Sequence, residues 1–73
     1  MPHIVVKMYP GVSEEQKEKI AQEITKIIME GTDKPEAAIS IAITEVAEDV
    51  WMEEVYEKEI KPNMDKLYKK PGY

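Results

Sequence analysis

The chain has 73 residues, 42% of them apolar and 34% charged, with no cysteine and a net charge of −5. This length allows one domain, expected to span residues 1–73, and the composition is that of a globular rather than a disordered chain. The acidic charge argues against nucleic-acid binding. The apolar runs are too short to cross a membrane, so we expect a cytoplasmic protein.

A chain this small buries only about 60% of its unfolded surface, so a monomer would be marginally stable. Without cysteine and with one histidine, it has neither disulfides nor the usual ligands of a zinc site to stabilise its core. Association with a second copy is the remaining common remedy. We therefore expect a homo-oligomer.

The first element expected is a strand over residues 3–9. Apolar and mixed side chains alternate there, with Ile4, Val6 and Met8 on one wholly apolar face. The dipeptide Pro10-Gly11 that follows predicts a turn, since proline has no N–H to extend a strand pair and glycine tolerates turn conformations.

A helix of about 18 residues is expected next. Ser13 and Gln16 have the spacing of a capping box, which places the start of the helix just after Ser13. Gly31 predicts a left-handed C-cap. Isoleucines recur between them at helical spacing and predict one buried stripe, formed by Ile20, Ile24, Ile27 and Ile28.

A second strand is expected over residues 39–45, where Ile39, Ile41 and Ile43 alternate with smaller or polar residues and should face the isoleucine stripe. Strand, helix and strand form a βαβ unit with parallel strands. A further helix is expected from Asp49, with a kink or restart near Pro62. The predicted fold is therefore α+β, in two layers, with a C-terminal helix.

Nothing in the chain is obviously assigned to cover the other face of the second strand, which carries Ser40, Ala42 and Thr44. Two strands do not make an independently stable sheet. A second subunit would complete a four-stranded sheet and cover that face.

Most catalytic motifs are absent: there is no glycine-rich phosphate loop, no GxSxG, no HExxH and no cysteine. The remaining candidate is Pro2. If Met1 is removed, Pro2 becomes a secondary amine at the head of the first strand. The pKa of a free α-amino group is about 8, and apolar burial lowers it toward neutral, which suits a general base.

Several features together resemble the tautomerase superfamily, in particular the 4-oxalocrotonate tautomerase-like proteins. They are a second-position proline opening a strand, a capped helix that begins SEEQKEKI, the strand ISIAITE and a following aromatic at Trp51. The chain is most similar to the dimeric PptA (YdcE) branch of that family. This similarity rests on the ending KKPGY, the segment SISIAI and the pattern of Trp51, Glu59, Ile60, Pro62 and Met64.

The resemblance implies a keto–enol tautomerase, an isomerase in which Pro2 carries the proton, with no metal and no cofactor. It also implies that Trp51 lines the pocket. Family members that act on dicarboxylates carry two arginines, at positions occupied here by Val12 and Ser40, and all ten basic residues of this chain are lysine. We therefore expect a small enol monocarboxylate such as enol-phenylpyruvate. Its polar end could be held by backbone amides near Tyr9, by the Ser40 hydroxyl or by a lysine.

Alternatives remain open at this point. The chain could be a non-catalytic oligomeric module that binds a small molecule, and Trp51 could be an ordinary packing residue. His3 follows Pro2, but strand alternation puts it on the opposite face, at the surface or in an interface. By resemblance to the dimeric branch, a homodimer is favoured over a hexamer.

Overall fold

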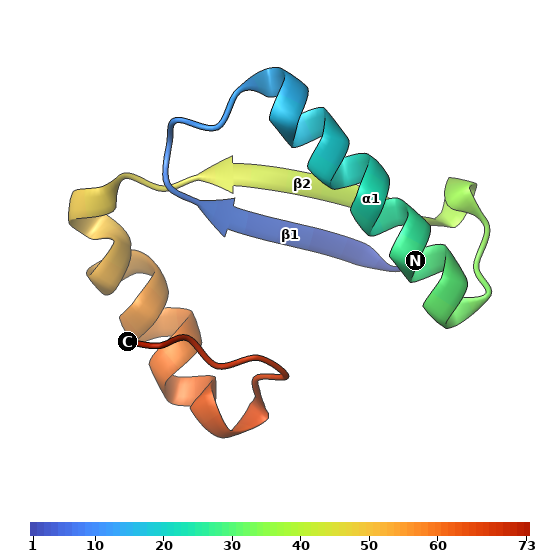
Figure 1. The fold of residues 1–73 in the computed structure, drawn as a ribbon. Helices are drawn as coiled ribbons and strands as arrows, with labels where there is room; N and C mark the ends of the chain where they lie inside the picture. Colours follow the sequence, from blue (N-terminus) through green and yellow to red (C-terminus); the bar gives the residue numbers. More distant parts are fainter.

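The computed structural model describes all 73 residues and consists of two parallel strands, one long helix and a helical C-terminal segment (Figure 1). Strand β1 spans His3–Met8, helix α1 Glu14–Thr32 and strand β2 Ser40–Glu45. The shorter elements are the 3₁₀-helices η1 (Glu36–Ala38), η2 (Glu48–Val50) and η4 (Lys61–Lys66), and the π-helix η3 (Met52–Ile60).

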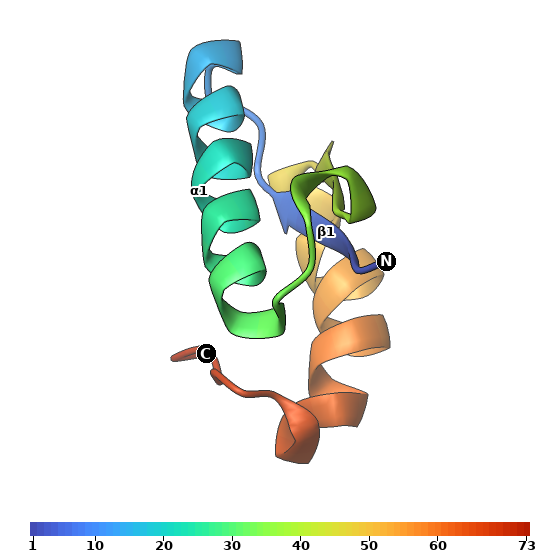
Figure 2. The same ribbon diagram turned by 90° about the vertical axis from the view of Figure 1, so that its right-hand side faces the viewer.

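Strands β1 and β2 pair in parallel, in a register that runs from His3 opposite Ser40 to Met8 opposite Glu45. The predicted βαβ unit is therefore confirmed. Opposed residues of a parallel pair share a face, so Ile4 and Ile41 belong to one face, and both are half-buried, as expected of the face that α1 covers. Figure 2 shows α1 on one side of the strands. The second strand begins one residue later than expected, since Ile39 precedes β2.

Helix α1 begins with the predicted capping box. The Gln16 N–H donates to Ser13 Oγ, and the Ser13 N–H donates to Gln16 Oε1, both at 3.1 Å. The predicted stripe is correct for three of its four isoleucines, which are half-buried. It is wrong for Ile27, which is 60% exposed, because Ile27 lies at the margin of a stripe that two strands are too narrow to cover.

The predicted end of α1 is wrong by two residues. Gly31 is still helical, and the left-handed cap is Asp33, at φ 57°, whose N–H donates to the Met29 carbonyl. The Thr32 hydroxyl donates to the Ile28 carbonyl at 2.7 Å and supports this last turn. Aspartate adopts the left-handed region more readily than most residues, so a glycine is not required here.

The C-terminal segment is helical, as expected, but it is not one α-helix. A 3₁₀ turn leads into nine residues of π-helix, where the Lys61 N–H donates to the Tyr56 carbonyl five residues before it. Pro62 has no N–H to continue that pattern, and η4 restarts the segment there as a 3₁₀-helix. Asn63 departs from helical angles at φ −114°, which confirms the kink predicted near Pro62.

The C-terminal segment and α1 lie on opposite sides of the strands (Figure 2). An ion pair between Lys7 of β1 and Glu59 of η3 ties this segment to the sheet. Val55 of η3, at 5% exposure, is the only buried residue of the chain. The chain therefore forms a layered scaffold whose core is not closed by its own residues. No helix is long and apolar enough to span a bilayer.

Candidate functional site

Two groups of the predicted site residues come together, one at each end of the strand pair. Pro2 is half-buried just before β1, and its carbonyl accepts the Ser40 N–H at 3.2 Å. The Ser40 hydroxyl and His3 Nδ1 are 2.7 Å apart. Pro2 and Ser40 are thus neighbours at the head of the sheet, and His3 is exposed beside Ser40.

Met1 is attached to Pro2, and its amine contacts the Ala38 carbonyl. In this form the Pro2 nitrogen is part of a peptide bond, so its lone pair is delocalised into the amide and cannot accept a proton. Removal of Met1 would free this nitrogen at the same place, because Pro2 is held by its own carbonyl and by the start of β1.

The second group lies at the opposite end of β1. Tyr9 and Trp51 pack edge to face, with ring centroids 5.2 Å apart and ring planes at 88°. Val12 is half-buried in the loop between β1 and α1, three residues after Tyr9. Val12, Tyr9 and Trp51 therefore belong to this end of the sheet, away from Pro2.

The structure adds one residue that the sequence did not single out. The Trp51 indole N–H donates to the Tyr73 hydroxyl at 2.9 Å, and the Tyr73 ring is 5.7 Å from the ring of Tyr56. In the sequence, the segment KKPGY predicts only an end to the helix. The available signal was a tyrosine after a Pro-Gly dipeptide, together with an indole N–H that needs an acceptor when partly buried.

A single chain does not bring the two groups together. The seven residue steps of extended chain from Pro2 to Tyr9 span about 23 Å, so Trp51 cannot reach the Pro2 of its own chain. A pocket that contains both would need two chains.

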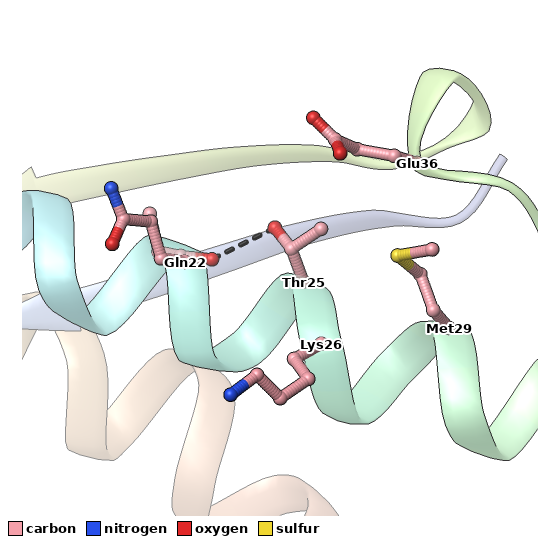
Figure 3. A pocket seen from close by; sticks show the side chains of 6 residues that line it. Gln22, Thr25, Lys26, Met29 and Glu36 are labelled. Atoms are coloured by element: carbon pink, nitrogen blue, oxygen red, sulfur yellow. Dashed lines mark hydrogen bonds between the residues drawn. The ribbon is translucent and has the colours of Figure 1, made fainter.

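The hollows of the chain lie elsewhere. The larger, with a volume of about 420 Å³, opens between α1 and η1 (Figure 3). Within it the Thr25 hydroxyl is occupied, since it donates to the Ala21 carbonyl at 2.8 Å. Neither hollow is lined by Pro2 or Trp51. The lining residues of the larger one are Ala21, Gln22, Thr25, Lys26, Met29 and Glu36.

Charged side chains near the sheet are mostly paired. Lys7 contacts Glu59, and Lys17 of α1 lies 2.9 Å from Glu45 at the end of β2. The hydrogen bond that the Lys17 ammonium group donates to Glu45 raises the pKa of that group above its usual value, and Glu14 acts in the same direction. No three histidine or acidic side chains are grouped so that they could hold a metal ion.

The family model described as "Tautomerase enzyme" matches residues 2–57, which begin at Pro2 and end inside η3. The chain belongs to this family, and the protein is accordingly an isomerase with tautomerase activity. The part of the chain that carries η4 and Tyr73 lies beyond the matched range.

Among its relatives are proteins named Tautomerase PptA. The chain is 42% identical to the one from Pectobacterium carotovorum, 40% to that from Cronobacter sakazakii and 38% to that from Escherichia coli O139:H28. Each alignment covers 100% of this chain and 97% of the relative. The similarity to the PptA branch expected from the sequence is therefore confirmed.

Two solved structures share the fold. One is YwhB, a homologue of 4-oxalocrotonate tautomerase, with a TM-score of 0.64 and 33% identity over 66% of this chain and 79% of that chain. The other comes from a study of trans-3-chloroacrylic acid dehalogenase activity, with a TM-score of 0.61 and 30% identity over 63% of this chain and 79% of that chain. Both confirm the expected α+β class.

Proposed function

We propose that the enzyme interconverts the enol and keto forms of a small monocarboxylate, with the amine of Pro2 as the general base. The observation that carries this proposal is the position of Pro2. It is half-buried at the head of β1, and it is the first residue matched by the family model. Release of Met1 would create a secondary amine there. The proline ring would restrict the direction in which the lone pair of this amine points.

The proposed step conserves atoms and charge without another reactant. The Pro2 nitrogen takes the proton of the enol hydroxyl, which leaves an enolate and a prolyl ammonium. The ammonium then returns the proton to the carbon next to the new carbonyl, and the free amine is restored. A base whose pKa lies near the working pH can both take and return this proton.

A second copy of the chain would complete the site. The carbonyl of Pro2 accepts the N–H of Ser40, and the carbonyl of Met8 accepts the N–H of Val46, just after β2. By alternation, the backbone groups of Val5 therefore point to the outer edge of β1. No strand of the chain pairs with that edge. Pairing of two β1 strands about a two-fold axis would be antiparallel, so the head of one strand would lie beside the end of the other.

In this homodimer, Tyr9 and Trp51 of one protomer would approach Pro2 of its partner. Their packed rings would form an apolar wall, which suits a substrate with an aromatic or other apolar body. Pairing through β1 is favoured over pairing through β2 because Tyr9, which packs on Trp51, directly follows β1.

The polar residues near Pro2 support a substrate with a single acid group. The chain has no arginine to form a two-pronged contact with a carboxylate, and Lys7 is paired with Glu59. The Ser40 hydroxyl is within hydrogen-bond distance of His3 and remains a neutral group. Ser40 shares a face of the strand pair with His3, and its N–H donates to the Pro2 carbonyl, so its hydroxyl lies at the same head of the sheet as the Pro2 nitrogen. On that ground we assign Ser40 to the polar end of the substrate.

The proposal is tested with enol-phenylpyruvate, by following the loss of enol absorbance with protein whose mass verifies the removal of Met1. Pro2→Ala is expected to lower kcat/KM by about 100-fold or more, the contribution typical of a positioned general base. The matched control keeps Pro2 but carries a short N-terminal extension, so that the nitrogen stays in a peptide bond, and it should be equally slow. Equal rates in all three proteins would overturn the proposal.

A further inference from the structure

The chain beyond η4 turns back, and its end lies beside the C-terminal helices (Figure 1). Pro71 is half-buried in this returning segment, and Tyr73 follows it. The Tyr73 hydroxyl accepts the Trp51 indole N–H at 2.9 Å across 22 residues of sequence. The ring of Tyr73 is tilted by 38° against the ring of Tyr56, which gives the hydroxyl a packed support.

Trp51 is therefore restrained from two directions. Tyr9 packs against the indole edge to face, and Tyr73 holds its only polar atom. A tryptophan side chain has two free torsions, and two contacts of different direction are enough to restrict both. Because the matched family range ends at residue 57, the Tyr73 contact belongs to a part of this chain outside the general family pattern.

We propose that Tyr73 is a positioning residue that holds the Trp51 ring in the orientation that receives an aromatic substrate. The inference rests on the proposed function, in which Trp51 forms a wall of the Pro2 pocket. Tyr73 does not touch the reacting atoms, so its loss should weaken the binding of an aromatic acid and leave the proton transfer itself unchanged.

The experiment compares the wild type with Tyr73→Phe, which keeps the ring on Tyr56 and removes only the hydroxyl. The control is Tyr68→Phe, because Tyr68 is fully exposed. Trp51 is the single tryptophan of the chain, so fluorescence reports on it alone. Its anisotropy is measured without ligand, and its quenching is titrated with 3-phenylpropanoate, an aromatic acid that has no carbonyl to enolise.

For Tyr73→Phe we expect lower anisotropy and a Kd for 3-phenylpropanoate that is about 2- to 10-fold higher, the range of one neutral hydrogen bond. KM for enol-phenylpyruvate should rise by the same factor at unchanged kcat, while Tyr68→Phe matches the wild type. The inference would be overturned if Tyr73→Phe had the same anisotropy and the same Kd as the wild type. It would also be overturned if the wild type did not bind 3-phenylpropanoate. Turnover that survives Pro2→Ala would instead overturn the proposed function, and the binding comparison would still decide the role of Tyr73.

Discussion

At the scale of single residues, the proposed preference for a monocarboxylate depends on the position occupied by Ser40. Its N–H donates to the Pro2 carbonyl, so whatever side chain stands at position 40 begins close to the proposed base. Here that side chain is short and neutral and interacts with His3. A second carboxylate on a substrate would find no arginine there.

Ser40→Arg should therefore shift the preference of the enzyme toward dicarboxylates. A charged hydrogen bond contributes about 1.5–3 kcal/mol, so kcat/KM for 2-hydroxymuconate relative to enol-phenylpyruvate should rise by about 10- to 100-fold. Ser40→Gln is the control, since it is polar and extended but neutral. An unchanged ratio in Ser40→Arg would show that position 40 does not face the substrate.

Single residues differ in how far the sequence could predict them. The place of Pro2 directly before a strand could be predicted from the alternation that follows it, whereas its role as a base stays a prediction from its own chemistry. Trp51 was predicted as an aromatic near the site, but not that it lies at the end of β1 far from its own Pro2. Tyr73 was missed because its contact with Trp51 depends on how the last residues fold back, and no local pattern encodes that path.

At the scale of elements, one lysine connects the helix to the sheet. Lys17 Nζ lies 3.4 Å from Glu14 in the first turn of α1 and 2.9 Å from Glu45 at the end of β2, and its side chain is only 16% exposed. The contact with Glu45 holds α1 against the end of the sheet from which the chain leads to Trp51. The pKa of the Lys17 ammonium group is raised mainly by its hydrogen bond to Glu45.

The raised pKa of Lys17 predicts a loss of stability at alkaline pH. The folded state holds this proton more tightly than the unfolded chain, whose lysine has the ordinary pKa of 10.5. The contribution of Lys17 to the free energy of unfolding is thus fully present below about pH 10.5 and is lost as the pH rises through the folded-state pKa. The stability advantage of the wild type over Lys17→Gln, measured by urea unfolding at one protein concentration, should be constant from pH 8 to 10 and shrink above that.

Lys26→Gln is the control for this measurement. Lys26 is 68% exposed and lies 3.8 Å from Glu23, so its loss should produce little difference at any of these pH values. A wild-type advantage over Lys17→Gln that does not change between pH 8 and pH 11.5 would contradict the assigned role of Glu45.

The elements also differ in how well the sequence predicts them. The capping box and isoleucine spacing of α1 act locally, and both were predicted correctly except at the last turn and at Ile27. The helix after Asp49 was predicted, but its π-helical form was not. Over nine residues, hydrophobic spacing does not distinguish 3.6 residues per turn from a wider helix.

At the scale of the whole molecule, the chain exposes too much surface for a self-contained monomer. Its accessible surface is 5754 Å², whereas a folded monomer of 8.4 kDa should expose about 4,600 Å². Its radius of gyration is 13.8 Å, against about 11 Å for a compact chain of this length. Val5, at the centre of β1, is 51% exposed. These values fit a subunit whose open side is covered by a second copy.

Sedimentation equilibrium should accordingly give twice the chain mass, and the thermal midpoint should fall on dilution.

Val5→Pro removes an N–H that points away from β2, so it should block pairing of β1 with a second copy and leave the β1–β2 pair intact. Val5→Thr keeps the N–H and serves as control. A folded Val5→Pro protein that still sediments as a dimer would exclude the β1 edge as the interface, and a hexameric wild type would mean that further surfaces associate.

The most direct test of a Pro2 site completed across two protomers is complementation between two impaired variants. Pro2→Ala lacks the base and Trp51→Ala lacks the wall, so each homodimer should be slow with enol-phenylpyruvate. After co-refolding in equal amounts, half of the dimers are mixed, and each mixed dimer has one intact site. We predict recovery to about a quarter of the wild-type rate. Activity no higher than the average of the two variants would contradict a shared site.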